Sequence, residues 1–345
     1  MGLALQQIKQ DKISKDLQRI YGQNLLSWFA NNSDSKIMKN DFSFSGKYIH
    51  RFFAYLGSDK SLGGFGRSQD EFTAAVKGCA EAVERKVYQS HIARKDLLNL
   101  DLIEGENFFE INPAFNKKSI DPSFYNSNGW AVGFTKESAL ERAKIEAIER
   151  HLLLYTFLKD GWNGFFIINR MKLDRIELIS LVSKYTLAGY SAGIGVAKSP
   201  KFLGASFGYL CDKTEKIKFS PKWEQAFYES YDYLRVRSQL EEFKPNSDSI
   251  SQGLNYYLEN DSNLIFADEE KLTEIGNTYC SSAAIIELKE MHNFEFPFFA
   301  AVVHGGDLLP LFFKRTLAAS GEKVLLERFK QLRLPVGIPE RHPIL

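Results

Sequence analysis

Three stretches of the chain place apolar side chains three or four residues apart, which is the spacing of one face of an α-helix. The first lies in the opening forty residues and ends in the polar segment 31–35. The second follows Ser68 and the third follows Thr135, both predicted as N-caps. We therefore expect three helices, and the apolar positions of the last two are Phe72, Val76, Cys79, Val83 and Val87, and Leu140, Ala143, Ala147, Ile148, Leu152 and Tyr155.

Segments rich in β-branched and aromatic residues predict strands between and after these helices. These segments are 48–56, 190–196, 202–210 and 296–303. Another helix is expected to begin after Ser220 and Pro221, because proline is favoured at the first helical position. A strand, a loop and a helix thus follow one another three times. This order predicts an α+β fold whose helices pack on mixed or antiparallel sheets.

The domain organisation read from the sequence is simple. Residues 1–44 are expected to form an N-terminal helical extension, and residues 45–345 one larger domain. The last residues of that domain contain three prolines at a spacing of four, Pro335, Pro339 and Pro343. Because proline interrupts a helix, this tail is predicted to be an extended arm.

A short acidic pattern occurs twice inside the predicted helices. The sequence E-A-V-E-R begins at Glu81, and E-A-I-E-R begins at Glu146. Residues three apart share a helix face, so Glu84 lies beside the first of these glutamates and Glu149 beside the second. Carboxylates about 4 Å apart repel by roughly 4 kcal/mol at an effective dielectric of 20, so a cluster of four needs a metal ion, arginines or protons. Magnesium beside a polyphosphate is the expected partner.

The plain alternative is that each copy is an ordinary solvated helix segment, because E-x-x-x-R is a common i,i+4 ion pair. The setting of the two copies favours a ligand site. Each copy follows a glycine-bearing segment, 63–67 or 127–135, which lets the backbone approach a group such as phosphate. Neither segment is a Walker A motif, which would require G-K-[ST].

Composition and charge exclude several classes of protein. The chain has 345 residues and a formal net charge of +1, so charge predicts neither a nucleic-acid partner nor an acidic membrane. The cysteines Cys79, Cys211 and Cys280 form no C-x-x-C pair, which argues against a disulfide framework and a zinc ribbon. Cys79 lies on an apolar helix face and is expected to be a buried, unreactive thiol. The sequence shows no signal-peptide core and no apolar run long enough to span a membrane, so we expect a cytoplasmic location.

The ordered motifs resemble those of the YcaO family, ATP-dependent enzymes that activate a backbone amide of a peptide. The resemblance covers residues 45–345. One family motif is a G-[KR]-G-like loop followed by a helix that ends in E-x-x-E-R, and residues 66–67 and 81–85 match it. The second and more specific motif is matched in register by Ser127, Asn128, Gly129, Gly133, Thr135, Ala139, Ala143, Glu146, Glu149 and Arg150.

The resemblance implies a site for ATP and magnesium. By this analogy the magnesium carboxylates are Glu81, Glu84, Glu146 and Glu149, and the cations that contact phosphate or balance the carboxylates are Arg67, Lys77, Arg85, Arg142 and Arg150. The chain departs from the family pattern in the nucleotide half of the site. Lys77 stands where the family has Ser, and the usual Ser, Asn, Glu and Gln of the second motif are replaced by Ala131, Phe134, Ser138 and Arg142.

Two functions follow from the resemblance and its departures. The first is Mg-ATP-dependent activation of a peptide amide, as in a cyclodehydratase that forms azolines, or in thioamide formation, during biosynthesis of ribosomally made peptides. The alternative is a non-catalytic YcaO-like subunit with a degenerate nucleotide site. Either function implies a precursor peptide or a partner enzyme, and the enzyme would use a separate leader-peptide-binding protein. A homodimer is compatible with both.

Overall fold

The computed structural model describes residues 2–57, 63–94, 129–200, 203–211, 222–239, 272–276, 282–288, 294–304, 308–309 and 319–335. The chain divides into two compact units. The first unit consists of Met1–Ile103, Gly129–Ala143 and Ala283–Val303, and the second of Glu104–Asn128, Lys144–Ser282 and His304–Leu345. Both contain helices and mainly antiparallel sheets, which confirms the predicted α+β class.

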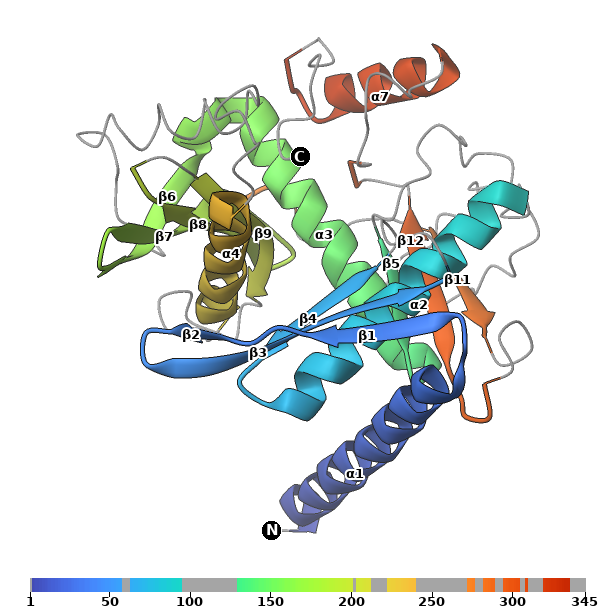
Figure 1. The fold of residues 1–345 in the computed structure, drawn as a ribbon. Helices are drawn as coiled ribbons and strands as arrows, with labels where there is room; N and C mark the ends of the chain where they lie inside the picture. Colours follow the sequence, from blue (N-terminus) through green and yellow to red (C-terminus); the bar gives the residue numbers. More distant parts are fainter. Residues whose placement is uncertain are drawn as a thin grey trace. The chain divides into compact units, whose positions relative to one another are not determined.

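The first unit opens with the long helix α1 (Gly2–Asn31), followed by a four-stranded sheet and the helix α2 (Glu71–Arg94). In this sheet the central strand β3 (Lys47–Leu56) pairs antiparallel with three others, β1 (Ser35–Lys39), β2 (Phe42–Phe44) and β4 (Gly64–Ser68). Helix α2 packs along β3 and β4 (Figure 1), and α1 packs against α2. The strands β1 and β2 thus precede residue 45 and belong to the same sheet as β3.

Two glycines explain why β4 lies so close to α2. A Cβ atom at Gly66 would collide with the carbonyl oxygen of Ala74, and one at Gly64 would collide with the carbonyl oxygen of Gly78. Both obstacles are helix backbone, which cannot move aside as a flexible side chain can. This segment, expected to be a loop, is therefore a strand whose glycines permit helix packing.

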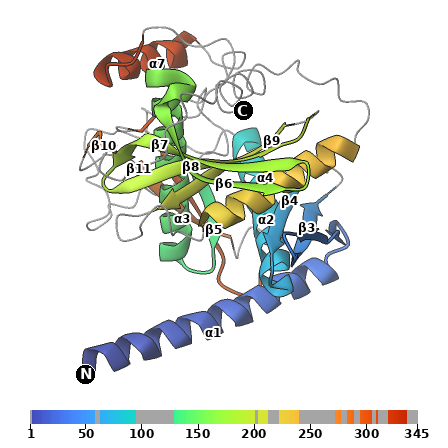
Figure 2. The same ribbon diagram turned by 90° about the vertical axis from the view of Figure 1, so that its left-hand side faces the viewer.

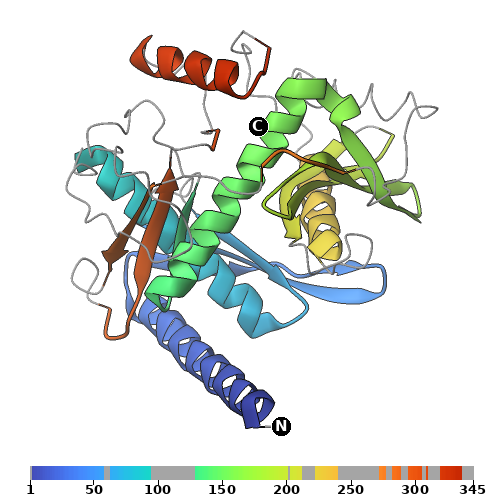
Figure 3. The same ribbon diagram turned by 180° about the vertical axis from the view of Figure 1, so that it is seen from behind.

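A three-stranded sheet completes the first unit. Its order is β11 (Ser282–Glu287), β12 (Phe299–His304) and β5 (Trp130–Gly133), and β12 is antiparallel to β5. The two orange strands β11 and β12 lie side by side in Figure 3. The helix α3 (Lys136–Asp160) starts directly after β5 and continues into the second unit.

The second unit is built on a five-stranded sheet. Its strands are β6 (Phe165–Leu173), β7 (Ile176–Leu187), β8 (Tyr190–Lys198), β9 (Leu203–Cys211) and the short β10 (Thr273–Glu274). The order β10-β7-β8-β9 is antiparallel except for the parallel pair β10 and β7, and β6 pairs with β7. A 3₁₀ turn (Gly161–Gly164) joins α3 to β6, and the helix α7 (Ala319–Gln331) follows later in the chain.

Helix α4 (Lys222–Gln239) covers one face of this sheet, where it runs along β8 and β9 (Figure 2). Gly195 of β8 allows the close approach, because a Cβ atom there would meet the backbone of Ala226. Ala226 also joins Phe166 and Val182 in a buried apolar cluster. The sheet and α4 therefore share one core.

Of the two predicted N-caps, the structure confirms one and contradicts the other. The Thr135 cap is confirmed, because its Oγ1 accepts a hydrogen bond from the N–H of Ser138 at 3.1 Å. The Ser68 cap is wrong. Asp70 caps α2 instead, since its Oδ1 accepts the N–H of Thr73 at 2.8 Å and the helix begins at Glu71.

The predicted strands 48–56, 190–196 and 202–210 correspond to β3, β8 and β9, and the predicted strand 296–303 begins later, as β12. The strands β6 and β7 were not predicted. The expected cap at Ser220 and Pro221 and most of the proline-spaced tail lie outside the described residues.

Candidate functional site

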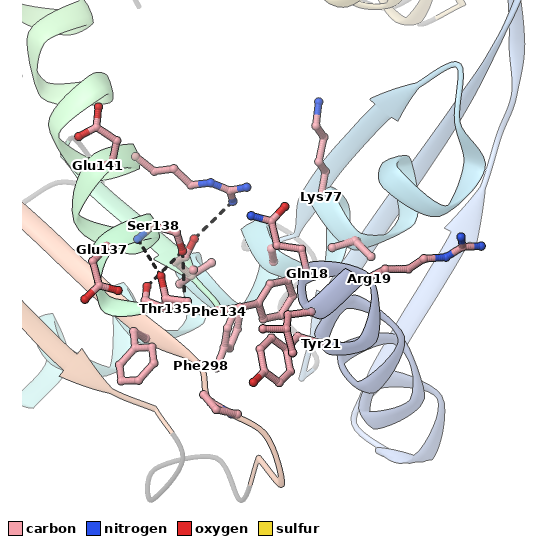
Figure 4. A pocket seen from close by; sticks show the side chains of 18 of the residues that line it. Gln18, Arg19, Tyr21, Lys77, Phe134, Thr135, Glu137, Ser138, Glu141 and Phe298 are labelled. Carbon is pink, nitrogen blue, oxygen red and sulfur yellow. Dashed lines mark hydrogen bonds between the residues drawn. The ribbon is translucent and has the colours of Figure 1, made fainter. Parts of the chain in front are cut away.

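A cavity of about 1190 Å³ lies within the first unit (Figure 4). Four separate segments line it: one turn of α1, the first three turns of α2, the junction of β5 with α3, and residues 297–299. Its volume is somewhat above the range of roughly 300–1,000 Å³ that is usual for small-molecule sites, so it can hold a ligand of that class. The cavity is therefore the candidate ligand site of this unit.

The start of α3 forms one wall of the cavity and is built by a capping box. Thr135 and Ser138 exchange hydrogen bonds, since each side-chain oxygen accepts the backbone N–H of the other residue, at 3.1 and 3.3 Å. Gly133 is required just before the box, because a Cβ atom there would collide with Ser138. The wall is thus fixed by local hydrogen bonds.

Two of the sequence-predicted cations line this same cavity, Lys77 from α2 and Arg142 from α3. Arg142 is exposed, and its Nη1 donates to the carbonyl oxygen of Val132 at 3.4 Å. Lys77 is half-buried. The structure therefore brings together two residues that are far apart in the sequence and that both depart from the family pattern.

Aromatic rings form another part of the lining. The ring centroids of Tyr21 and Phe134 are 5.8 Å apart, and those of Phe134 and Phe298 are 5.3 Å apart. These distances are within the range of interacting aromatic pairs. Sequence reasoning missed Tyr21 and Phe298, since no local pattern links α1 to the segment before β12.

Carboxylates also reach the cavity, from Asp70, Glu137 and Glu141. The pKa of the Asp70 carboxyl is held below its usual range, because the hydroxyl and the N–H of Thr73 donate to it. Asp70 is thus engaged in capping α2. The charged lining is mixed, with lysine and arginine beside these acids.

Glu81 ties α2 to β4. Its Oε2 accepts the N–H of Phe65 at 2.6 Å, and its Oε1 accepts Nη2 of Arg85 at 2.5 Å. Arg85 donates in addition to the carbonyl oxygen of Gly63 at 2.6 Å. The Glu81 carboxylate, predicted to bind the metal, is therefore held in one orientation by β4 and by the arginine of its own motif. Glu84, one helical turn later, is half-buried.

Arg67 lies on β4, where it is 8% exposed and directly opposite Arg51 of β3. Both guanidinium groups lie over the ring of Phe65, at 5.5 and 5.2 Å from its centroid. Arg67 is not among the residues that line the cavity. Its predicted contact with a nucleotide stays a prediction.

The second glutamate pair lies in the second unit. Glu149 is 9% exposed, and its carboxylate packs against Gly208 of β9, which has a φ of +99° and where a Cβ atom would collide with it. Its Oε1 is 3.7 Å from Nε of Arg150. Glu146 is half-buried.

Because the two pairs belong to different units, the four-carboxylate site stays a prediction. Among the described residues, no group of three or more His, Cys, Asp or Glu side chains is placed to hold a metal ion.

Two other titratable side chains, Cys79 and His151, are buried, and burial shifts the pKa of each. Cys79 is fully buried, as predicted, and burial raises the pKa of its thiol to about 12. His151 is 2% exposed, and its Nδ1 accepts the N–H of Leu309 at 2.8 Å. Burial, together with the charge of Arg328, lowers the pKa of His151 to about 3, so the ring is neutral at pH 7.

In the described part of the chain, no helix has the length and apolar character needed to cross a membrane. A comparison with models of known protein families finds no match, and a comparison with curated proteins finds none either.

Solved structures show similarity over most of the chain. A structure of YcaO from Methanopyrus kandleri bound with AMPPCP and Mg²⁺ is 14% identical, covers 93% of this chain and 96% of its own, and gives a TM-score of 0.46. The E. coli microcin synthetase McbBCD complex is 8% identical over 88% of this chain and 96% of the other, with a TM-score of 0.44. The same complex with pro-MccB17 bound is 10% identical over 79% and 88%, also with a TM-score of 0.44. The YcaO family, whose motifs the sequence resembles, is thus found again among the solved structures to which this chain is similar.

Proposed function

We propose that this chain is a YcaO-type enzyme that binds Mg-ATP and uses it to activate the backbone amide of a precursor peptide, for azoline or thioamide formation. One observation carries the proposal. Lys77 and Arg142, two cations at positions where the family pattern has uncharged residues, line one cavity that is large enough for a nucleotide. Two such cations suit the phosphate groups of a nucleotide.

The spacing of charges on the two helices supports this proposal. Glu81 and Glu84 follow Lys77 by four and seven residues on α2. Glu146 and Glu149 follow Arg142 by the same intervals on α3. Helical periodicity places residues at these intervals on one face. Each helix would therefore carry one cation for phosphate and two carboxylates for magnesium.

The carboxylates of the first unit fit magnesium. Mg²⁺ in nucleotide sites is usually held by one or two carboxylates together with phosphates and water. Glu81 and Glu84 supply two, and the hydrogen bonds from Phe65 and Arg85 keep the first of them oriented. When bound, magnesium would neutralise charge on the phosphate chain.

The roles of the chain's own residues follow from this arrangement. Phosphoryl transfer depends mainly on positioning and on charge stabilisation. Lys77 and Arg142 would orient the phosphate chain and balance the negative charge on it. Arg85 would act indirectly, by holding Glu81. A peptide amide oxygen that receives the phosphoryl group becomes easier to expel, and a separate protein would recognise the leader of the precursor peptide.

A specific contact favours the non-catalytic subunit as a second candidate. Phe134 stands where the family has Asn, and its ring lies against Tyr21 of α1. A phenyl ring forms none of the hydrogen bonds that an amide offers to a nucleotide. In a subunit that binds only a peptide or a partner enzyme, this contact would close the former nucleotide site.

Ligand-induced stabilisation separates the two candidates. For the enzyme, a non-hydrolysable ATP analogue at about 100 times its Kd should stabilise the protein by about 2.7 kcal/mol with magnesium, and removal of magnesium by EDTA should abolish the rise in melting temperature. Glu81→Gln should lose the rise measured against its own ligand-free baseline. The control Glu177→Gln, in a hairpin of the second unit where Glu177 pairs with Arg170, should keep it.

Two results would contradict the enzyme. An equal rise without magnesium or in Glu81→Gln would remove the metal role of this carboxylate. The absence of any rise in the wild-type chain would favour the non-catalytic subunit.

A further inference from the structure

The cavity has an aromatic part and a charged part. Tyr21, Phe134 and Phe298 gather in the lower half of Figure 4, whereas Lys77 and Glu141 lie above them. The ring of Phe134 lies between the other two in space, because it pairs with Tyr21 on one side and with Phe298 on the other. A flat apolar group would stack on this surface, while an anionic group of the same ligand would face the cations.

Helix α1 adds a hydrogen-bonding group to the aromatic part. Gln18 and Tyr21 are three residues apart, so they share one face of α1, and both line the cavity. The carboxamide of Gln18 donates and accepts hydrogen bonds at the same time. This combination matches the edge of adenine, where N6 donates and N7 accepts.

The position of α1 is fixed firmly enough for such a role. Gly22 lets the helix approach α2 closely, because the side chains of Phe72 and Val76 occupy the space that a Cβ atom at Gly22 would need. Farther along α1, the ring of Trp28 lies 4.6 Å from that of Phe294. Tyr21 therefore directly precedes the turn of α1 that packs against α2, and a second contact holds the helix farther toward its C-terminus.

We infer that Gln18 and Tyr21 of α1, together with Phe134, form a binding site for the purine base of a nucleotide. The inference rests on the proposed function, because it assumes that the phosphate chain lies at Lys77 and Arg142. Stacking on an aromatic side chain strengthens binding by about fivefold to hundredfold for each base and tolerates any base. Tyr21 and Phe134 thus provide affinity, and Gln18 provides the preference for adenine. In this arrangement α1 is a specificity element of the nucleotide site.

Calorimetric titration of the full chain in the presence of magnesium tests the inference. The ligands are non-hydrolysable analogues of ATP and GTP, and inorganic tripolyphosphate, which has the phosphate chain without a base. The wild-type chain should bind the ATP analogue at least tenfold more tightly than tripolyphosphate. Tyr21→Ala should lose about tenfold for the ATP analogue and leave tripolyphosphate unchanged, while Tyr21→Phe, which keeps the ring, should bind as the wild type does.

Two further variants complete the test. Gln18→Ala should reduce the preference for the ATP analogue over the GTP analogue by several-fold. Ile20→Ala is the matched control, because Ile20 lies on α1, is 49% exposed and does not line the cavity, so it should change no affinity.

The outcomes distinguish this inference from the proposed function. Equal binding of tripolyphosphate and the ATP analogue by the wild-type chain would overturn the base site and leave the phosphate site standing. The base site would also be wrong if Tyr21→Ala weakened both ligands equally. If neither ligand bound, the proposed function and the base site would both fail.

Discussion

Side chains of the acidic motifs combine a structural role with a proposed chemical one, and Glu81, which does not line the cavity, shows this most clearly. Its two oxygens accept hydrogen bonds from Phe65 and Arg85, so the carboxylate links β4 with α2. A carboxylate oxygen has two lone pairs, so it can accept more than one contact. Arg85 is occupied by Glu81 and by the Gly63 carbonyl, which favours a role in balancing the carboxylate over direct contact with phosphate.

Lys77 is the residue that best separates the enzyme from the non-catalytic subunit. If it orients phosphate, Lys77→Ala should lower the rate of ATP turnover by roughly a hundredfold, the loss expected for one preorganised charge. Lys77→Arg should retain part of the rate, because the positive charge remains. A gain of nucleotide affinity in Lys77→Ser would show instead that the lysine blocks the cavity.

The buried His151 predicts a pH dependence of stability. Its pKa is about 3 in the folded protein and about 6.5 in the unfolded chain, so the unfolded state binds the proton first as the pH falls. The free energy of unfolding should therefore be unaffected by this group above pH 6.5 and fall progressively below it, by roughly 2 kcal/mol at pH 5. Denaturant titrations at pH 7 and pH 5 measure the loss.

His151→Asn provides the control for this prediction. Asparagine can still accept a hydrogen bond from the Leu309 N–H but does not titrate. The variant should lose less stability than the wild type between pH 7 and pH 5. An equal loss in both proteins would assign the pH dependence to other groups.

At the scale of secondary-structure elements, the close contact of β4 with α2 is the feature whose effect on stability can be tested most directly. Gly66→Ala should place a methyl group against the carbonyl oxygen of Ala74 and push the strand from the helix, at a cost of about 1–3 kcal/mol. Gly46→Ala is the comparison, because Gly46 has a φ of +76° and open space around it, so only backbone strain is added there. Chemical denaturation of both variants measures the costs.

The two variants also differ in what they do to the site. Displacement of β4 should weaken Mg-nucleotide binding, because Phe65 and Gly63 hold the Glu81 motif in place. Gly46→Ala should leave binding unchanged. Wild-type affinity in a folded Gly66→Ala variant would contradict the role of β4 in orienting this carboxylate.

The sequence allowed some of these elements to be predicted, for physical reasons that differ between them. Helices α2 and α3 have a clear apolar period, and the Thr135 cap was recognisable. Strand β7 was missed because residues 178–183 are buried at every position, so no alternation distinguishes them from a helix. Strand β4 was read as a loop because glycine is unfavourable in strands unless packing demands it.

The same limits apply to the candidate site. Lys77 and Arg142 were identified individually, as departures from a family pattern. Their common cavity depends on four segments that only the tertiary fold assembles. Gln18 and Tyr21 carried no signal, since they lie in a helix that reads as an N-terminal extension.

At the scale of the whole molecule, the glutamates proposed to hold magnesium are divided between two units. The first contains the cavity and the pair Glu81 and Glu84, and the second contains Glu146 and Glu149. Helix α3 runs from one unit into the other, so its cation and its carboxylates belong to one continuous element.

Crystallography of the full chain with a non-hydrolysable ATP analogue and Mn²⁺ tests the proposed magnesium-nucleotide binding most directly, because the anomalous signal of Mn²⁺ locates the metal. We predict a Mn²⁺ peak coordinated by one or more of the four motif glutamates, Glu81, Glu84, Glu146 and Glu149, with the phosphate chain in contact with Lys77 and Arg142. A nucleotide bound outside the cavity, a metal coordinated away from these glutamates, or the absence of both ligands at saturating concentrations would contradict it.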